Sequence, residues 1–373
     1  MIPVLDIAKL LASHGVKCTV VTTTLNAPIF TKAIHKTQHL GYEITLKIIK
    51  FPAVEAGLPQ DCESADKTTS EKMTLKFFKT TAMLQDPFEK ILRDVQPQCL
   101  VADMFFPWAT HVAAKFGIPR LSFFGTSFFS LCSGESLRLY KPHIKASSDS
   151  ELFKILGLPD TIKLTRRQTP DINAFGNEPE LYKWKESCEA DERKICHSLM
   201  LLNCAELRWL EATGKPLIWV VGKSKDGYEN DDCLPSGFEK RMKDRGLITR
   251  GWAPQLLIPK HKAVGAFVTN CGWIEGISSG VPLLIWPLFA EQFLNEKLVT
   301  QVLRIGVSVG AQPSARFGGE TVKSERIEEA INRVLEGEQA EKIRSQAKEC
   351  GDLAKKAYKY LKALIEELKY EYP

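Results

Sequence analysis

The second half of the chain contains the stretch GWAPQLLIPKHKAVGAFVTNCGWIEGISSGVPLLIWPLFAEQFLNEKLV, residues 251–299. Two short apolar runs inside it, GAFVT at 265–269 and VPLLIW at 281–286, have the length and composition of buried strands. Further strand candidates lie outside it: PLIWVV at 216–221, GLITR at 246–250 and IGVSVG at 305–310. Helix-like segments separate these runs, and this alternation is typical of parallel strands joined by helices. The second half therefore predicts an α/β domain.

The first half shows the same alternation of predicted strands and helices. Its strand candidates are VKCTVVT at 16–22, YEITLKII at 42–49, CLVAD at 99–103, PRLSFF at 119–124 and SLMLLN at 198–203. Between them, residues 7–11, 75–92 and 108–116 carry apolar side chains at three-to-four-residue spacing, as amphipathic helices do. We expect two facing Rossmann-like domains, residues 1–203 and 204–345, followed by a C-terminal helix over residues 346–373.

Composition excludes several classes of protein. The 373 residues include 50 Lys+Arg against 45 Asp+Glu, a net charge of +5 without a basic stripe, so nucleic acid is not an expected partner. The ten cysteines form no C-x-x-C pair, which favours reduced thiols and no metal site. The N-terminus lacks a basic leader, and no apolar run reaches the roughly 18 residues of a membrane span. We expect a cytoplasmic monomer.

The 251–299 stretch resembles the signature box of the plant secondary-product glycosyltransferases, family 1 of the UDP-dependent glycosyltransferases. Its fixed points occur in order: Trp252, Ala253, Pro254, Gln255, His261, Gly265, Phe267, Cys271, Gly272 and Trp273. Segments of the first half, such as KFPAVEAGLP and FFGTSFFSLC, look like the acceptor domain of the same family. The resemblance implies an α/β fold of GT-B type, inverting sugar transfer from a UDP-sugar to a hydroxyl of a small molecule, and no metal or other cofactor.

The resemblance also implies a role for each polar group in the box. Trp252 would stack on uracil, although a half-buried core tryptophan is the alternative that the GWAPQ context disfavours. Ala253 would bind the base edge through its backbone, and Gln255 and Glu275 would hold the ribose. The pyrophosphate would lie at the helix start that the turn Cys271-Gly272-Trp273 supplies, where Asn270 can donate a hydrogen bond. Glu291 and Gln292 would hold the sugar, and the glutamine points to UDP-glucose.

Three departures from the family pattern predict impaired activity. Where the family reads His-Cys-Gly-Trp-Asn-Ser, two residues and Glu, this chain has Asn270 in place of the histidine and reaches Glu275 three residues early. An interdomain linker and a strand are missing between Asn203 and Leu207. The family's catalytic histidine would stand immediately before Met1, so we expect the chain to lack its base, which typically contributes about 10²–10⁴-fold to the rate.

Asp103 matches the carboxylate that orients this catalytic histidine, and a helix N-cap ahead of Phe106 is an equal alternative. Three other histidines are alternatives for a replacement base, of which His111 is the least implausible. His14 and His261 are expected to be structural, and His111, eight residues after Asp103, is expected at the surface. Asp103 is therefore the one catalytic candidate.

Three functions remain open from the sequence. The first is a UDP-glycosyltransferase of weakened activity, which transfers glucose to a hydroxyl of a flavonoid-like or terpenoid-like acceptor. The second is a catalytically inactive UDP- or small-molecule-binding remnant of such an enzyme. The third is an incomplete gene model of an active enzyme.

Overall fold

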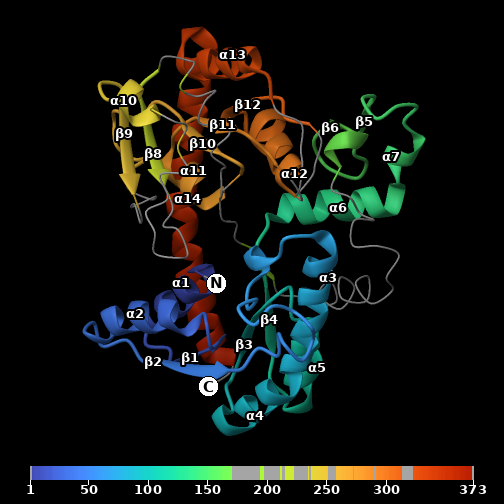
Figure 1. Cartoon of the computed structure of the whole chain (residues 1–373), viewed down its shortest axis with the longest axis vertical. Coiled ribbons are helices and arrows are strands. Elements are labelled where there is room, and N and C mark those ends of the chain that lie inside the picture. The colour runs from blue at the N-terminus through green and yellow to red at the C-terminus, as the bar shows by residue number, and fades with distance from the viewer. Residues whose placement is uncertain are drawn as a thin grey trace. The chain divides into compact units, whose positions relative to one another are not determined.

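The computed structural model describes residues 2–169, 194–196, 211, 215–221, 234, 237–250, 258–271, 273–288, 291–312 and 322–371 (Figure 1). The chain divides into two compact units. Unit 1 contains the described residues of 1–125, 175–197 and 359–373, and unit 2 contains those of 126–174 and 198–358.

Unit 1 is built from strands that alternate with helices. Its elements are α1 (Ile2–Ser13), β1 (Cys18–Thr23), α2 (Ala27–Gln38), β2 (Ile44–Ile49), η1 (Ala65–Lys67), α3 (Glu71–Thr80), η2 (Thr81–Leu84), α4 (Gln85–Val95), β3 (Leu100–Asp103), α5 (Trp108–Lys115), β4 (Arg120–Phe124) and β7 (Lys194–Cys196). All pairings are parallel: β1 with β2, and β3, β4 and β7 in that order. Parallel strands need helical crossovers, which the intervening helices supply.

The core of unit 1 follows from the spacing of its apolar residues. Leu5, Ala8 and Ala12 lie three and four residues apart on α1, so they form one buried face. This face packs with Val20 of β1 and Ile44 of β2. A second cluster joins Phe51, from the segment that follows β2, to Phe77 of α3 and Leu84 of η2.

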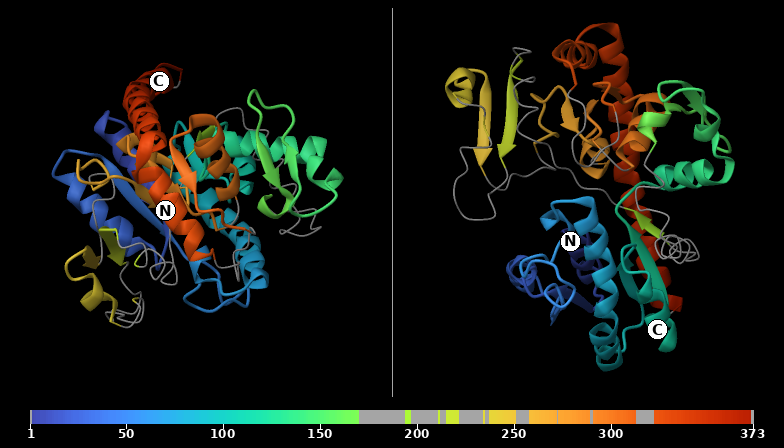
Figure 2. Two further views of the ribbon diagram at one scale, coloured as in Figure 1. Left: turned by 90° about the horizontal axis from the view of Figure 1, so that it is seen from above. Right: turned by 45° about the vertical axis from the view of Figure 1, so that its right-hand side comes forward.

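Unit 2 combines an antiparallel hairpin with two parallel sheets. Its elements are α6 (Phe128–Tyr140), α7 (Pro142–Lys145), β5 (Leu152–Lys154), β6 (Lys163–Thr165), η3 (Arg166–Gln168), β8 (Leu217–Val221), α10 (Phe238–Met242), β9 (Gly246–Arg250), β10 (Phe267–Thr269), α11 (Trp273–Ser279), β11 (Leu283–Ile285), α12 (Gln292–Lys297), the π-helix η6 (Leu298–Leu303), β12 (Gly306–Ser308) and α13 (Ser324–Leu335). The helix α14 (Gly337–Glu371) belongs to unit 2 up to residue 358 and to unit 1 from residue 359. The sheets are β10-β11-β12 and β8-β9. Figure 2 shows α10 beside β8 and β9, where Phe238 and Met242 are buried.

The central strand of unit 2 has no exposed face. All three residues of β11, Leu283 to Ile285, are buried, because β10 and β12 flank it and helices cover it. Gly306 of β12 stands opposite Leu283, and a Cβ at this position would lie 2.4 Å from the Leu283 carbonyl oxygen. The close approach of two strands therefore requires glycine there.

Most predicted strands lie where the structure has them. Those at 16–22, 42–49, 99–103 and 119–124 correspond to β1, β2, β3 and β4, whereas the one at 198–203 falls outside the described residues. The hairpin β5–β6 was not predicted. Its residues belong to unit 2, although the predicted first domain runs to 203. The boundary at 203 also lies outside the described residues, so the domain limits stay predictions.

Among the helices that the structure describes, none has both the length and the apolar character needed to cross a bilayer.

Candidate functional site

The turn from β10 to α11 carries the predicted phosphate-binding residues. β10 ends at the buried Thr269, whose Oγ1 accepts a hydrogen bond from the backbone N–H of Cys271 at 3.0 Å. Asn270 is also buried, with 3% of its surface exposed. α11 begins at Trp273, so three residues connect strand and helix. The predicted Glu275 lies in the first turn of α11.

Cys271 has an unusual backbone. Its φ is +91°, in the region that glycine tolerates and other residues rarely adopt. Its Sγ donates to the carbonyl oxygen of Gln292 at 3.4 Å. Burial raises the pKa of the Cys271 thiol well above its ordinary value, and the carboxylates of Glu296 and Glu291 act in the same direction. The thiol therefore stays protonated and is not a nucleophile.

The start of α12 carries the two residues predicted to hold the sugar. Glu291 is the N-cap residue of α12 and Gln292 is its first helical residue. The Oε1 atom of Gln292 accepts a hydrogen bond from the N–H of Leu288 at 2.8 Å, which fixes the plane of the amide. Glu291 is half-buried, and burial raises the pKa of its carboxyl.

The structure brings the β10–α11 turn and the start of α12 together. β10 and β11 are adjacent parallel strands, so the segments that follow them leave the sheet at the same edge. Ligands of α/β proteins bind at this edge. The contact between Cys271 Sγ and the Gln292 carbonyl joins the two segments directly. Asn270 and Gln292, both predicted site residues, therefore belong to one part of the molecule.

Other predicted residues of the box cannot be placed in this way. Trp252, Ala253, Gln255 and Gly272 lie outside the described residues, and only the backbone of Trp273 and Glu275 is described. Their roles stay predictions.

Asp103, the predicted catalytic carboxylate, closes the turn after β3. Its Oδ1 accepts a hydrogen bond from the N–H of Phe105 at 2.9 Å. Burial raises the pKa of the Asp103 carboxyl, although the bond from Phe105 works against the shift. Asp103 is not the N-cap of α5, because Pro107 holds that position. The N-cap role that the sequence left open for Asp103 is therefore wrong. Its carboxyl group instead closes the turn that follows β3.

The buried Arg120 of β4 supports the same turn. Its Nη2 donates to the backbone oxygen of Asp103 at 3.2 Å, and its Nη1 donates to Thr110 of α5. The guanidinium therefore ties the end of β3 to the following helix, and its charge opposes the rise in the pKa of Asp103.

The three histidines weighed as bases occupy different settings. Nδ1 of His14 lies 2.9 Å from the carbonyl oxygen of Leu10, at the end of α1. His261 is exposed, and its Nδ1 accepts from the N–H of Ala263 at 3.3 Å. His111 is exposed on α5, as predicted.

Two groups of polar residues were missed by sequence reasoning. Glu296 and Lys297 of α12 are both buried, and Lys297 Nζ lies 3.0 Å from Glu296 Oε1. Ser130 of α6 is buried against Asn295. Residues 295–297 follow the predicted site residue Gln292 by less than two helical turns. This closeness in sequence is a signal that could have identified them. No local pattern marks Ser130, whose partner is 165 residues away.

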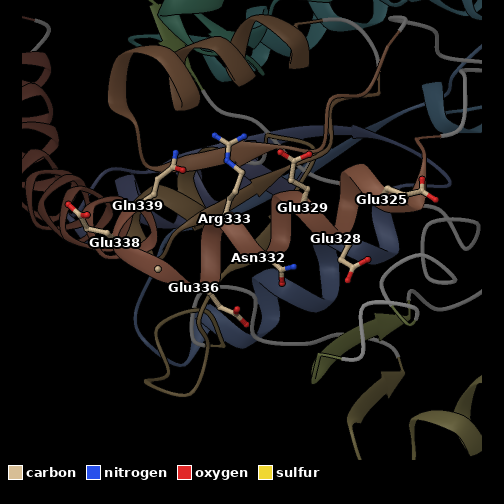
Figure 3. A pocket seen from close by; sticks show the side chains of 9 residues that line it. Glu325, Glu328, Glu329, Asn332, Arg333, Glu336, Glu338 and Gln339 are labelled. Atoms are coloured by element: carbon tan, nitrogen blue, oxygen red, sulfur yellow. The ribbon is translucent and has the colours of Figure 1, made fainter.

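A groove of about 780 Å³ lies elsewhere in unit 2, along α13 and the start of α14 (Figure 3). Its lining includes the five glutamates Glu325, Glu328, Glu329, Glu336 and Glu338, with Arg333 as the one basic side chain among the lining residues. Such a negative surface repels the phosphates of a nucleotide. The groove contains no predicted site residue. Within the described residues there is also no group of three or more His, Cys, Asp or Glu side chains that could hold a metal.

Comparison with known proteins extends these observations. The profile of the family described as UDP-glucoronosyl and UDP-glucosyl transferase matches residues 233–344, which include the β10–α11 turn and α12. The scopoletin glucosyltransferase of Nicotiana tabacum is 41% identical over 457 aligned positions, covering 99% of this chain and 95% of the relative. The UDP-glucose flavonoid 3-O-glucosyltransferase 7 of Fragaria ananassa is 44% identical over 445 positions, covering 95% and 89%.

Solved structures agree with the sequence relatives. Glycyrrhiza uralensis UGT73P12, complexed with glycyrrhetinic acid 3-O-monoglucuronide, superposes with a TM-score of 0.81 at 32% identity, covering 99% of this chain and 93% of that one. The predicted α/β fold of GT-B type is confirmed by this match. Identity of 41–44% over nearly the whole length leaves one assignment: the chain belongs to the plant UDP-glycosyltransferases.

Proposed function

We propose that this protein transfers glucose from UDP-glucose to a hydroxyl group of a small apolar plant metabolite, such as a phenolic or a terpenoid, at a reduced rate. The observation that carries the proposal is the meeting of the β10–α11 turn with the start of α12, at the contact between Cys271 Sγ and the Gln292 carbonyl oxygen. Both segments lie within the region that matches the family profile.

The start of α12 supports recognition of a sugar. Glu291 offers a carboxylate and Gln292 an amide, and both groups can bind sugar hydroxyls. The bond from Leu288 N–H orients the Gln292 amide before a ligand arrives, which lowers the entropic cost of binding. The choice of glucose rests on this glutamine and on the glucosyltransferases among the relatives.

The reaction requires one proton transfer. The acceptor oxygen attacks C1 of glucose, a new glycosidic bond forms, the bond from C1 to the phosphate oxygen breaks, and UDP leaves. The acceptor's proton passes to a base. Asp103 is the group of this chain proposed to assist that step, because its carboxyl group stands at the carboxyl end of a parallel strand and is held by Phe105 N–H.

Two observations favour a reduced rate. Asn270 is neutral where the family has a histidine, and a neutral hydrogen bond contributes about 1 kcal/mol less than a charged one. The alignments with the tobacco and strawberry relatives also run over 457 and 445 positions, more than the 373 residues of this chain, which supports the absence of internal segments that these relatives possess. The strained Cys271 lies next to Asn270, just ahead of the shortened part of the box, which follows Trp273.

An activity assay tests the proposal. The purified chain is incubated with UDP-glucose and a panel of coumarin, flavonoid and triterpenoid acceptors, and glucosides are detected by mass spectrometry. Gln292→Asn, which withdraws the amide by one methylene, should lower kcat/KM at least about fivefold. Gln339→Asn on the exposed face of α14 serves as the matched control and should leave it unchanged. Absence of glucoside with every acceptor would refute the proposed transfer.

A non-catalytic UDP-binding protein is the second candidate, because the strained backbone at Cys271 and the buried, neutral Asn270 both weaken a phosphate site more than a base or ribose site. Isothermal calorimetry distinguishes the two functions. Measurable UDP binding without any turnover supports the second candidate, and turnover of any acceptor excludes it.

A further inference from the structure

A buried polar contact joins α6 to α12 within unit 2. Ser127, the N-cap residue of α6, donates its hydroxyl to Asn295 Oδ1 at 2.6 Å. Ser130, one turn further along α6, donates to the same oxygen. Asn295 is completely buried and Ser130 nearly so. One amide oxygen of α12 therefore accepts two hydroxyl groups from α6.

Asn295 lies on the same face of α12 as the residues proposed to hold the sugar. It follows Glu291 by four residues and Gln292 by three, the spacing at which helical side chains are neighbours. Its backbone N–H donates to the Glu291 carbonyl oxygen at 2.9 Å, in the first turn of the helix. Rotation of α12 about its axis would therefore move Asn295 and Gln292 together.

Apolar contacts hold the same two helices together but do not fix this rotation. Leu137 of α6 and Leu294 of α12 share a core with Ile155, Ile162 and Leu164, and apolar packing is not directional. A hydrogen bond to a buried oxygen is directional, because turning the oxygen away breaks the bond in a site that is closed to bulk solvent. The serine pair is therefore the part of this interface that selects one orientation of α12.

A second pair of hydrogen bonds lies at the other end of the segment formed by α12 and η6. Gln301 of η6 donates from Nε2 to the Lys163 carbonyl oxygen at 2.8 Å and accepts from the Lys163 N–H at 3.0 Å. The continuous α12–η6 segment is thus fixed to residues 126–168 at both ends, by Ser127 and Ser130 at one and by Lys163 at the other.

We propose that Ser127 and Ser130, acting through Asn295, are positioning residues that set Glu291 and Gln292 against the donor sugar. The inference rests on the proposed function and deepens it. None of the three residues touches the reacting atoms. The consequence of losing them is a selective loss of sugar recognition, since the groups predicted to hold the uracil and ribose lie on other segments.

Calorimetric titration of the full chain with UDP and with UDP-glucose tests this role. Asn295→Leu removes the amide at similar volume and should weaken binding of UDP-glucose about fivefold more than binding of UDP, the effect of one lost hydrogen bond. Asn295→Asp keeps the accepting oxygen and should restore most of the preference. The Asn295 Nδ2 atom has no hydrogen-bond partner among the described residues, so the oxygen carries the contact.

Ser133→Ala is the matched control. Ser133 is fully buried one turn beyond Ser130, and in the described part of the chain its hydroxyl has no hydrogen-bond partner, so both affinities should stay as in the parent. Equal losses of both ligands in Asn295→Leu, or no loss of either, would overturn the positioning role while leaving the proposed function intact. A parent chain that binds neither ligand would instead overturn the proposed function, and the positioning role with it.

Discussion

β3 in unit 1 and β10 in unit 2 both end in a turn that leads into a helix, yet the two turns have different backbones. After β3, four residues reach α5, none of them has a positive φ, and the Asp103 carboxylate accepts the N–H of Phe105. After β10, three residues reach α11, and Cys271 adopts a φ of +91°. In both turns a side chain at the end of the strand accepts the N–H two residues on, Asp103 from Phe105 and Thr269 from Cys271, but only the shorter turn also has a non-glycine residue with positive φ.

The other non-glycine residues with positive φ in the described chain explain why Cys271 is exceptional. Gln96, Lys141 and Arg304 have φ values of 45–55° and each is the C-cap of a helix, where a left-handed residue satisfies the final carbonyl groups. Cys271 precedes a helix and gains no such bond. Backbone strain of this kind persists where the surroundings over-determine the conformation, and it is concentrated at functional sites.

The largest effect on stability is expected at the C-terminal end of α11. A substitution there disturbs the packing that holds the turn at Cys271 in its strained conformation. A Cβ on Gly351 of α14 would lie 2.7 Å from the Cα of Gly280, the residue that follows α11. Because backbone atoms cannot rotate away, Gly351→Ala should lower the free energy of unfolding by about 2 to 3 kcal/mol. Urea denaturation of the purified variant measures this change.

Gly134→Ala provides the matched control for the contact at Gly351. Gly134 also lies inside a helix, and a Cβ there meets nothing within 4 Å. The substitution should stabilise the protein by about 0.5 to 1 kcal/mol, because alanine loses less backbone entropy than glycine on folding. If Gly351→Ala and Gly134→Ala change the free energy of unfolding alike, α11 is not held at its C-terminal end. The explanation of the strain at Cys271 then fails.

A smaller effect is expected at the strained residue itself. Cys271→Ala and Cys271→Gly both remove the buried thiol, but only glycine relieves the positive φ. The glycine variant should therefore be about 1 kcal/mol more stable than the alanine variant, the reverse of the usual order. Denaturant midpoints of the two variants measure the difference, and the usual order would show that the short turn is as relaxed as the long one.

The third prediction concerns the turn after β3. It is a change in how steeply the free energy of unfolding depends on pH. Burial raises the pKa of Asp103 above the ordinary 3.8, so the folded state holds the proton more tightly than the unfolded state. Its contribution to stability is complete below this value and is lost as pH rises through the folded pKa. Asp103→Asn keeps the acceptor for Phe105 N–H, so its stability should fall less than that of the parent over this window.

Asp352 on α14 is the control of opposite sign. A hydrogen bond from Lys355 lowers the pKa of this exposed carboxyl, so its contribution is present at neutral pH and lost in acid. Asp352→Asn should remove a small stabilisation above pH 4, reduced further by salt. Parallel pH profiles for Asp103→Asn and the parent would show that the Asp103 carboxyl is not buried enough to resist ionisation.

Sequence patterns predicted most strands of both units, because a β-branched or apolar run of five to eight residues can be recognised without knowledge of the rest of the chain; β7 was not predicted. The hairpin β5–β6 was missed because its strands, LFK and KLT, lie in a polar stretch with little apolar periodicity. The contact of Ser127 with Asn295 was missed because 168 residues separate them. The strain at Cys271 was not predicted, since cysteine has no preference for positive φ and no local pattern marks this conformation.

The sharing of one apolar core between residues 126–168 and α12 bears on how this protein can be dissected. A recombinant fragment beginning at residue 204 would contain Leu294 but not Leu137, Ile155, Ile162 or Leu164, which cover it. The uncovered leucine and its neighbours would form an exposed apolar patch that promotes aggregation. A soluble donor-binding fragment should therefore include the α6–β6 segment, joined in cis or supplied by co-expression.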